Sequence, residues 1–397
     1  MVVGTASLAL ACSATAAPAR RPSLPAVVPP PAAPSAVETP AQRVLRLVNG
    51  FRSTAGLPGV VLDAKLSVGC MEHARYMRLN RDTDAMAGLN AHHQRANLPG
   101  ATPAGAACGA AADLFPGVAD LGTAVDGWMA GFYHRRPILD PDLRSIGVGY
   151  APLPDGTLMA AVMFDDANGS AEPAAIAYPA NGQTGVPLQY GSEIPDPVPS
   201  TTPGGYPVTL QVPAFDALTG VTAKLVGPDG RAVPIYLSTP EAPATSFGQY
   251  GVICLIATRP LTPATTYRVV IDATWSQRPS HWAWSFTTVA LRRVDASDDA
   301  AITAAVGTPS LVRGTVIYGG MMDSDTVFLT LGPDGAHPRM VSVIIDLEQW
   351  KLVTGTAAPA AFLGATIEVQ ATPQLVQSQY LNLPVALAAH LRVIARP

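Results

Sequence analysis

The feature of this sequence that most constrains its fold is a change in hydrophobic pattern at about residue 175. Before that point, apolar residues recur three or four positions apart, as they do on one face of a helix. After it, they fall in short runs separated by Pro, Gly and Asp, which is the pattern of strands joined by turns. One regular architecture does not accommodate both patterns, and 397 residues exceed the usual size of a single core. We therefore expect several domains.

The first 38 residues have the composition of an export signal and a spacer. Residues 1–17 are apolar or small and end in a small-x-small cleavage pattern, which predicts a signal peptide. Residues 18–38 are rich in Pro and Ala, which predicts an extended linker. A loose lipobox ends at Cys12, so a lipid anchor on Cys12 is the alternative to plain cleavage. No later stretch reaches the roughly 18 apolar residues of a spanning helix. The expected location is extracellular or in the cell envelope.

Charge and motif content limit the function classes. The net charge is −4 and residues 291–397 contain no basic stripe, which argues against nucleic acid as a partner. Charged residues make up only 14%, whereas 39 Pro and 35 Gly favour turn-rich β domains over a helical enzyme. The sequence lacks HExxH, GxSxG, Walker, GxGxxG and CxxC motifs. These observations favour a binding or structural role over catalysis.

Helix signals dominate residues 39–167. A capping box at Thr39 and Gln42, with proline at the first helical position, begins one helix, and Asp63 is placed to cap a second. A third helical pattern surrounds Trp128. Two short strand-like runs separated by a Pro-Asp-Gly turn complete this part. Helices followed by strands predict a layered α+β domain.

Two β parts follow. Residues 175–290 contain six short strand patterns separated by turn signals, which is typical of a β-sandwich. The last pattern alternates Trp282, Trp284 and Phe286, which we assign to the inward face, with a carbohydrate-stacking platform as the alternative. Residues 291–397 contain five strand patterns interrupted by a helical stretch, which fits a small closed barrel of the OB type.

Three cysteines remain beyond Cys12. Cys70 and Cys108 fall in the same predicted domain, Cys108 in a loop before the third helix, and an oxidising compartment favours a disulfide between them. Two buried free thiols are the alternative. Cys254 lies in an apolar strand pattern, so we interpret it as a buried hydrophobic side chain.

Two stretches of the helical part resemble the CAP superfamily, which comprises the cysteine-rich secretory, antigen 5 and pathogenesis-related proteins. The first is LVNGFRSTAGLPGVVLDAKLSVGCMEHARYM. The second, AVDGWMAGFYHRRPILDPDLRSIGVGYA, has a helix with a Trp, a His-Arg turn and an I-G-V-G strand in the CAP order. The resemblance covers about residues 40–167 and implies a bacterial-type CAP domain with a three-layer α-β-α sandwich fold.

CAP proteins commonly place two His and two carboxylates around a central cleft. His134 matches one of the histidines, and His92 or His93 lies where the other is expected. Small residues stand where the two carboxylates are expected, at 109–111 and 122–123. The resemblance therefore implies a cleft without its acidic pair.

A metal in that cleft would need a further ligand. Catalytic zinc usually has three protein ligands, and two imidazoles alone fall short of that number. Asp113, Asp120 and Asp126 are the candidates to substitute, although no spacing demands any of them. We therefore expect no cofactor, and a zinc site through His134 and His92 is the alternative.

Neighbouring charges offer a second kind of site. Arg135 and Arg136 are candidates to bind an anion beside His134, although such pairs are more often solvated or neutralised, here by Asp140 or Asp142.

The other histidines have simpler interpretations. His73 shares an apolar helix face and is interpreted as a histidine at the core edge, while His281, His337 and His390 are interpreted as surface residues.

The β-sandwich part resembles bacterial Ig-like domains of cell-surface proteins. The stretch YPANGQTGVP has the form in which such domains often open, and LTPATTYRVVI is similar to an Ig and fibronectin-type element. In that element a Tyr at the strand entrance hydrogen-bonds back across the corner, and Tyr267 is its counterpart. The likeness of the last part to OB folds depends on strand order alone.

Two functional hypotheses follow. The first is a secreted or cell-surface protein whose CAP-like domain binds a cell-wall or extracellular ligand without chemistry. That ligand is a glycan, a peptide or a lipid. The alternative is a metal-assisted hydrolase that uses His134 with His92 or His93. A purely structural spacer would follow if side chains filled the cleft.

Overall fold

A computed structural model describes residues 38–165, 175–199, 204–213, 216–247, 249–332, 340–355, 358–376, 380–385 and 388–396. The expected signal peptide, most of the linker and the candidate lipid-anchor Cys12 lie outside the described residues. The chain divides into two compact units, Met1–Glu38 and Thr39–Pro397, and the described helices and strands belong to the second. No helix among the described residues is long and apolar enough to cross a membrane.

The first part, the α/β region, contains five helices and a four-stranded sheet of order β1-β3-β4-β2. The helices are α1 (Pro40–Thr54), α2 (Ala64–Leu79), α3 (Pro103–Ala111), α4 (Leu121–Ala130) and α5 (Arg135–Ile138). The strands are β1 (Val61–Leu62), β2 (Ala112–Val118), β3 (Ser145–Pro152) and β4 (Leu158–Asp165). β1 pairs with β3 in parallel, and the other pairs are antiparallel.

Capping explains where the first two helices begin. The Thr39 side chain accepts the backbone N–H of Gln42, and the Gln42 side chain accepts the backbone N–H of Thr39. Asp63 caps α2 by accepting the N–H groups of Lys65 and Leu66. Both predicted start signals are confirmed. The 3₁₀ turns Asp84–Met86 and Gly88–His92 lie between α2 and α3.

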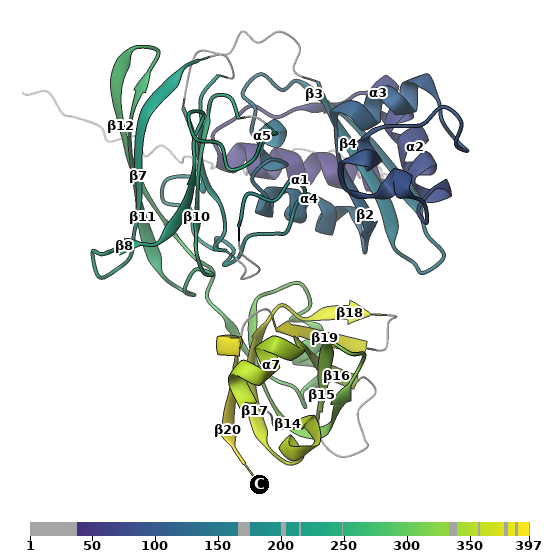
Figure 1. Ribbon diagram of the computed structural model, residues 1–397, viewed down its shortest axis with the longest axis vertical. Helices are drawn as coiled ribbons and strands as arrows, with labels where there is room; N and C mark the ends of the chain where they lie inside the picture. The colour runs from purple at the N-terminus through teal and green to yellow at the C-terminus, as the bar shows by residue number, and fades with distance from the viewer. Residues whose placement is uncertain are drawn as a thin grey trace, which may run out of the picture. The chain divides into compact units, whose positions relative to one another are not determined.

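Helices cover both faces of this sheet. Figure 1 shows α2 and α3 on one side of β3 and β4, and α1 with α4 on the other. Each face has its own core, because Ile146 and Val148 of β3 pack with the α1 and α4 side, whereas Ala151 packs with Cys70 of α2. The region is thus layered as helices, sheet and helices, as the resemblance implied.

Two glycines of β3 let α2 lie directly against the strand. A Cβ at Gly149 would be 2.0 Å from the carbonyl carbon of Cys70, and one at Gly147 would be 2.4 Å from the Cβ of Leu66. Residues with side chains are therefore excluded at both positions. This contact is the physical reason for the glycine alternation that characterises the strand.

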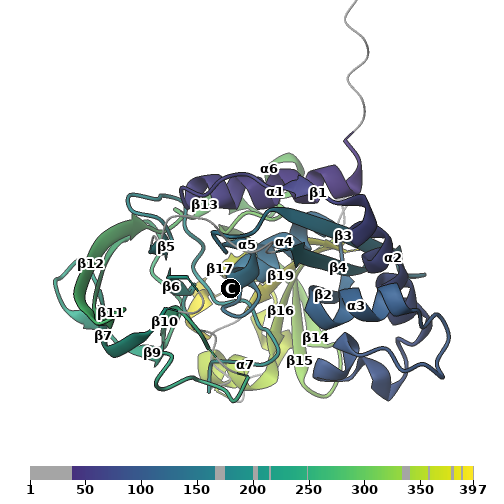
Figure 2. The ribbon, with the colours of Figure 1, turned by 90° about the horizontal axis from the view of Figure 1, so that it is seen from above.

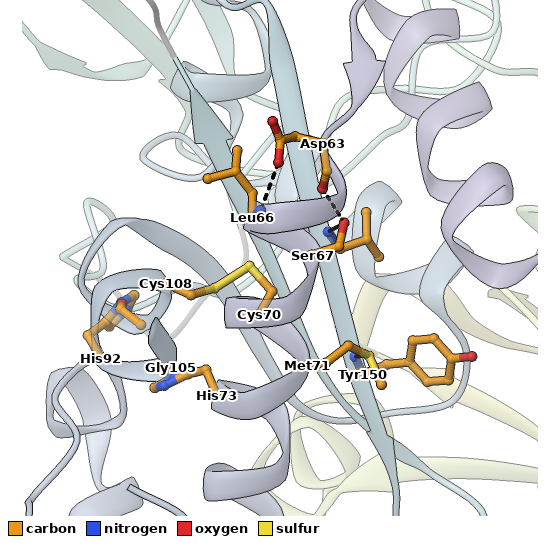
Figure 3. The surroundings of a disulfide bond; sticks show 12 residues. Asp63, Leu66, Ser67, Cys70, Met71, His73, His92, Gly105, Cys108 and Tyr150 are labelled. Atoms are coloured by element: carbon orange, nitrogen blue, oxygen red, sulfur yellow. Dashed lines mark hydrogen bonds between the residues drawn. A yellow bond between two sulfur atoms is a disulfide. The ribbon is translucent and has the colours of Figure 1, made fainter. Parts of the chain in front are cut away.

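A disulfide joins Cys70 of α2 to Cys108 of α3, which confirms the predicted pairing (Figure 3). Cys108 lies on a helix and not in the predicted loop. The sequence of α3, PAGAACGAA, is too uniformly small to show an amphipathic pattern, which is why the helix escaped prediction.

The second part, the two-sheet region, consists of two antiparallel four-stranded sheets of order β5-β6-β10-β9 and β12-β11-β7-β8 (Figure 2). The first sheet contains β5 (Ile176–Tyr178), β6 (Val208–Gln211), β9 (Ile235–Ser238) and β10 (Val252–Ala257). The second contains β7 (Leu218–Val226), β8 (Ala232–Val233), β11 (Thr266–Trp275) and β12 (Arg278–Thr287).

Side chains of both sheets share one core. Trp284 and Phe286 are buried in it and Trp282 packs partly against it, which agrees with the inward face predicted for this strand. The hydroxyl of Tyr267 accepts the N–H of Thr262 at 2.9 Å, so the predicted corner hydrogen bond is present.

The outer face of β10 is covered as well. Cys254 and Val252 pack with Phe132 and Tyr133 of the α/β region, so the predicted burial of Cys254 is confirmed. The two regions are thus joined by apolar contact as well as by the chain.

The third part is a largely β region around an eight-stranded sheet, in which β13 pairs with β14 beside the path β18-β19-β16-β15-β14-β17-β20. Its strands are β13 (Arg292–Asp295), β14 (Ser310–Met321), β15 (Thr326–Leu331), β16 (Met340–Asp346), β17 (Thr366–Ala371), β18 (Gln374–Val376), β19 (Tyr380–Val385) and β20 (Leu391–Ala395). Its helices are α6 (Asp299–Thr303) and α7 (Leu347–Thr354), the latter where the sequence predicts one. The strand path is open at both ends, so the described strands form no closed barrel and the OB-type barrel is not confirmed.

Candidate binding cleft

A cleft of about 500 Å³ lies where the α/β region meets loops of the two-sheet region. The polar groups of the α/β region in the cleft are three histidines, an arginine and two aspartates: His92, His93, His134, Arg136, Asp113 and Asp140. The two-sheet region contributes Ile194, Pro195, Gln211, Val212, Phe247 and Tyr250. The cleft therefore has polar groups from one region and mainly apolar and aromatic groups from the other.

His134 is held by a carboxylate from outside the α/β region. Glu193 lies between β5 and β6, and its side chain is only 2% exposed. Its carboxylate accepts the backbone N–H groups of Phe132 at 2.5 Å, Tyr133 at 3.0 Å and His134 at 3.3 Å, and bonds the His134 Nδ1 at 2.8 Å. Burial alone would lower the pKa of His134, but the Glu193 hydrogen bond and the charges of Asp113 and Glu193 raise it. The imidazole thus has a fixed orientation.

His92 is held at one ring nitrogen as well. Its Nδ1 lies 2.9 Å from the carbonyl oxygen of Gly109, so this nitrogen carries the proton and donates it. Burial lowers the pKa of His92 despite this hydrogen bond, and the ring is neutral near pH 7. His93, the other sequence candidate, is exposed at the edge of the same cleft.

Asp113 lines the cleft from β2 and is 8% exposed. Its Oδ2 has no hydrogen-bond partner among the described residues. Burial raises the pKa of Asp113 to about 8, with the charge of His134 opposing and that of Glu193 adding to the effect. The carboxyl group is therefore protonated near pH 7 and available as a hydrogen-bond donor.

The other two aspartates proposed as substitutes lie elsewhere. Asp120 caps α4 by accepting the N–H groups of Gly122 and Thr123, and Asp126 is exposed on the same helix. Neither lines the cleft. No group of three His, Cys, Asp or Glu in the described parts of the chain is arranged to hold a metal ion.

The two adjacent arginines have different surroundings. Arg135 is 1% exposed and points away from the cleft, donating to the carbonyl oxygens of Met129 and Pro207 and stacking over the rings of Tyr178 and Tyr206. It joins the α/β region to the two-sheet region and is not among the residues that line the cleft. Arg136 is the arginine that lines the cleft.

The other histidines in the described part of the chain do not line the cleft. His73 is fully buried and bonds the carbonyl oxygen of Ala91 at 3.0 Å, deeper than the core edge that the sequence indicates. His281 is exposed beside Asp272, His390 is partly buried, and His337 lies outside the described residues.

Sequence reasoning missed the residues that the two-sheet region supplies. Glu193, Phe247 and Tyr250 are 59, 113 and 116 positions beyond His134, in loops without a motif. Only the fold brings them to the cleft. The sequence contains one indirect indication: the expected acidic pair is missing, so a carboxylate from another part of the chain is needed to take its place.

Comparison with known proteins matches the α/β region to one family. No similar sequence is found among curated proteins. Among solved structures, the chain is similar to CopC from Methylosinus trichosporium OB3b with 12% identity and a TM-score of 0.21, over 30% of this chain and 95% of that one. A TM-score this low supports no assignment. The model of the cysteine-rich secretory protein family, CAP, matches residues 45–164, which include the His134 side of the cleft. Residues 45–164 therefore form a CAP domain.

Proposed function

We propose that this chain is an exported protein of the cell envelope or extracellular space whose cleft binds a ligand without catalysing a reaction. The ligand is a glycan, peptide or lipid of that compartment. The signal-like residues 1–17 and the CAP domain support the location.

The observation that carries the proposal is the set of groups that the cleft brings together. His134 is bonded through Nδ1 to Glu193, and His92 through Nδ1 to Gly109. Asp113 is protonated near pH 7 because its pKa is about 8, so it is a weak ligand for a cation. These Nδ1 hydrogen bonds leave an imidazole able to bind a metal through Nε2. The described residues, however, bring no third His, Cys, Asp or Glu into a metal-binding group with the two histidines. The volume and the aromatic edge of the cleft suit a bound molecule instead.

The β regions are proposed as modules that present the CAP domain. The Ig-like assignment of the two-sheet region is supported by its paired sheets and by the Tyr267 corner. The OB-like assignment of the third region has only the sequence order of strands and helix in its support.

Metal analysis tests the proposal against the hydrolase alternative. Protein purified without a histidine tag should contain far less than one zinc per chain, and micromolar zinc should leave its melting temperature unchanged. A site at a hundred times its Kd would add about 2.7 kcal/mol, which is easily detected. Stoichiometric zinc that is lost in both His134→Ala and His92→Ala would establish the metal-assisted alternative.

A further inference from the structure

Exposed large apolar side chains gather at the mouth of the cleft. Leu89, Ile194, Phe247 and Tyr250 are 40%, 58%, 58% and 70% exposed, and all four line it. Such side chains are ordinary when scattered, but a group around one cavity marks an interaction site.

The aromatic part of this edge is held in place. The hydroxyl groups of Tyr133 and Thr245 are 2.7 Å apart, and the rings of Tyr133 and Phe247 meet edge to face with centroids 5.5 Å apart. The loop between β9 and β10 is therefore tied to the CAP domain next to the cleft. A ligand would meet a preformed apolar wall, which lowers the entropy lost on binding.

Arg136 gives the cleft a positive charge without a bound partner. No hydrogen bond or ion pair from the described residues reaches its guanidinium group, whereas the buried Arg135 next to it has several. Burial lowers the pKa of Arg136, and the charges of Tyr133 and Asp140 oppose this shift. Asp140 lines the same cleft, and its Oδ1 accepts the N–H of Asp142. An unpaired guanidinium in a partly enclosed site favours a planar anion such as a carboxylate.

Asp113 is a second group of the cleft that favours an anionic ligand. Its buried and unpartnered Oδ2 is a neutral acid at pH 7, and a neutral acid donates a hydrogen bond to an anionic oxygen. Burying such a group without a partner is unfavourable, so a ligand oxygen that accepts from it is stabilised.

We propose that the cleft binds a carboxylate carried on an apolar or aromatic body, with the carboxylate toward Arg136 and Asp113 and the body against Phe247 and Tyr250. The inference rests on the proposed binding function and names its ligand class. A neutral sugar would leave Arg136 without an anion and is disfavoured. Two sources share the favoured chemistry: the free C-terminus of a peptide that ends in an apolar residue, and a free acyl chain.

Matched acid and neutral probes test the inference on the full chain. Calorimetric titration would compare N-acetylphenylalanine with N-acetylphenylalaninamide, and octanoate with octanol, at low and at physiological salt. We expect each acid to bind at least tenfold more tightly than its neutral partner, because a charge-assisted pair is lost in the neutral probe. The tighter of the two acids identifies the source as peptide or acyl chain.

Substitutions connect the preference to the cleft. Arg136→Gln should abolish the preference for the acid, whereas Arg231→Gln, which removes an 88% exposed arginine elsewhere, should leave it unchanged. Tyr250→Ala should weaken acid and neutral probe together. Equal binding of acid and neutral probes, or a preference that survives in Arg136→Gln, would overturn the inference while leaving a binding function intact. Failure of all four probes to bind would overturn the inference, and failure of glycan and peptide ligands as well would overturn the proposed function.

Discussion

Replacing Asp113 with Asn should stabilise this protein at neutral pH. In the folded chain the pKa of Asp113 is about 8, against a usual value of 3.8, because the carboxyl is buried and lies near Glu193, with His134 opposing the shift. Between these two values the unfolded chain has released the proton and the folded chain still holds it, so stability falls as pH rises. A pH of 7 lies 3.2 units above the usual pKa of 3.8 and still below the folded pKa. At 1.36 kcal/mol per unit, the buried acid therefore lowers the free energy of unfolding at pH 7 by about 4 kcal/mol.

The gain has a predicted size and pH dependence. Water that enters the cleft reduces this loss of stability. We therefore expect Asp113→Asn to raise the free energy of unfolding by about 2–4 kcal/mol at pH 7. The gain should fall to about 0.6 kcal/mol or less at pH 4, where the unfolded carboxyl is itself close to half protonated, and should be largest at pH 8 and above. Urea denaturation at pH 4, 6, 7 and 8 measures it.

A second aspartate provides the control. Asp120 has its pKa lowered in the folded state, so Asp120→Asn should be neutral or slightly destabilising at pH 7. A destabilised Asp113→Asn at pH 7, or a gain that is the same at pH 4 and pH 8, would refute the reasoning. The expected result would mean that the chain retains a destabilising acid in its cleft, as functional sites often do.

Three further predictions address the fold and the cleft. Gly149→Ala should lower the free energy of unfolding by about 3 kcal/mol or more, or prevent folding, because its Cβ would overlap the Cys70 carbonyl. Gly50→Ala has open space in α1 and should raise the free energy of unfolding by up to about 1 kcal/mol. Thermal unfolding measures both changes. Reduction of the Cys70–Cys108 disulfide, which closes a loop with a sequence separation of 38, should lower the free energy of unfolding by about 4 kcal/mol or less, and an unchanged midpoint after reduction would contradict this. Glu193→Gln should cost about 2–3 kcal/mol near pH 6, since it weakens four hydrogen bonds to a buried carboxylate. Because the folded pKa of His134 is raised, the loss in free energy of unfolding should have its full size below about pH 6.5 and become smaller as pH rises through the folded pKa. A loss that does not change with pH would argue against the His134–Glu193 pair.

Local signals allowed much of the fold to be predicted. Thr39 and Asp63 begin helices because their side chains satisfy backbone N–H groups within three residues, and Cys70 and Cys108 are close because their helices pack together. The helix α3 was missed because its small residues have no periodicity. Short strands such as β18, with three residues, carry too little pattern to be recognised.

The candidate site was predictable only in part. His134 and His92 follow from the CAP resemblance, and Asp113 was one of three acidic candidates that spacing alone could not separate. The choice between Arg135 and Arg136 depends on which one the two-sheet region covers, and adjacent residues carry no signal for that. Long-range packing brings Glu193 to His134 and places Phe247 and Tyr250 in the cleft, and no local pattern encodes such packing.

The most direct test of the account is a crystal structure of the full chain with N-acetylphenylalanine, and a second with indole-3-acetate. We predict the carboxylate of each within hydrogen-bond distance of the Arg136 guanidinium, the aromatic ring against Phe247 or Tyr250, and the His134–Glu193 hydrogen bond intact. Both acids bound outside the cleft, or a cleft that holds only water while its aromatic edge is covered by the protein's own side chains, would contradict the account.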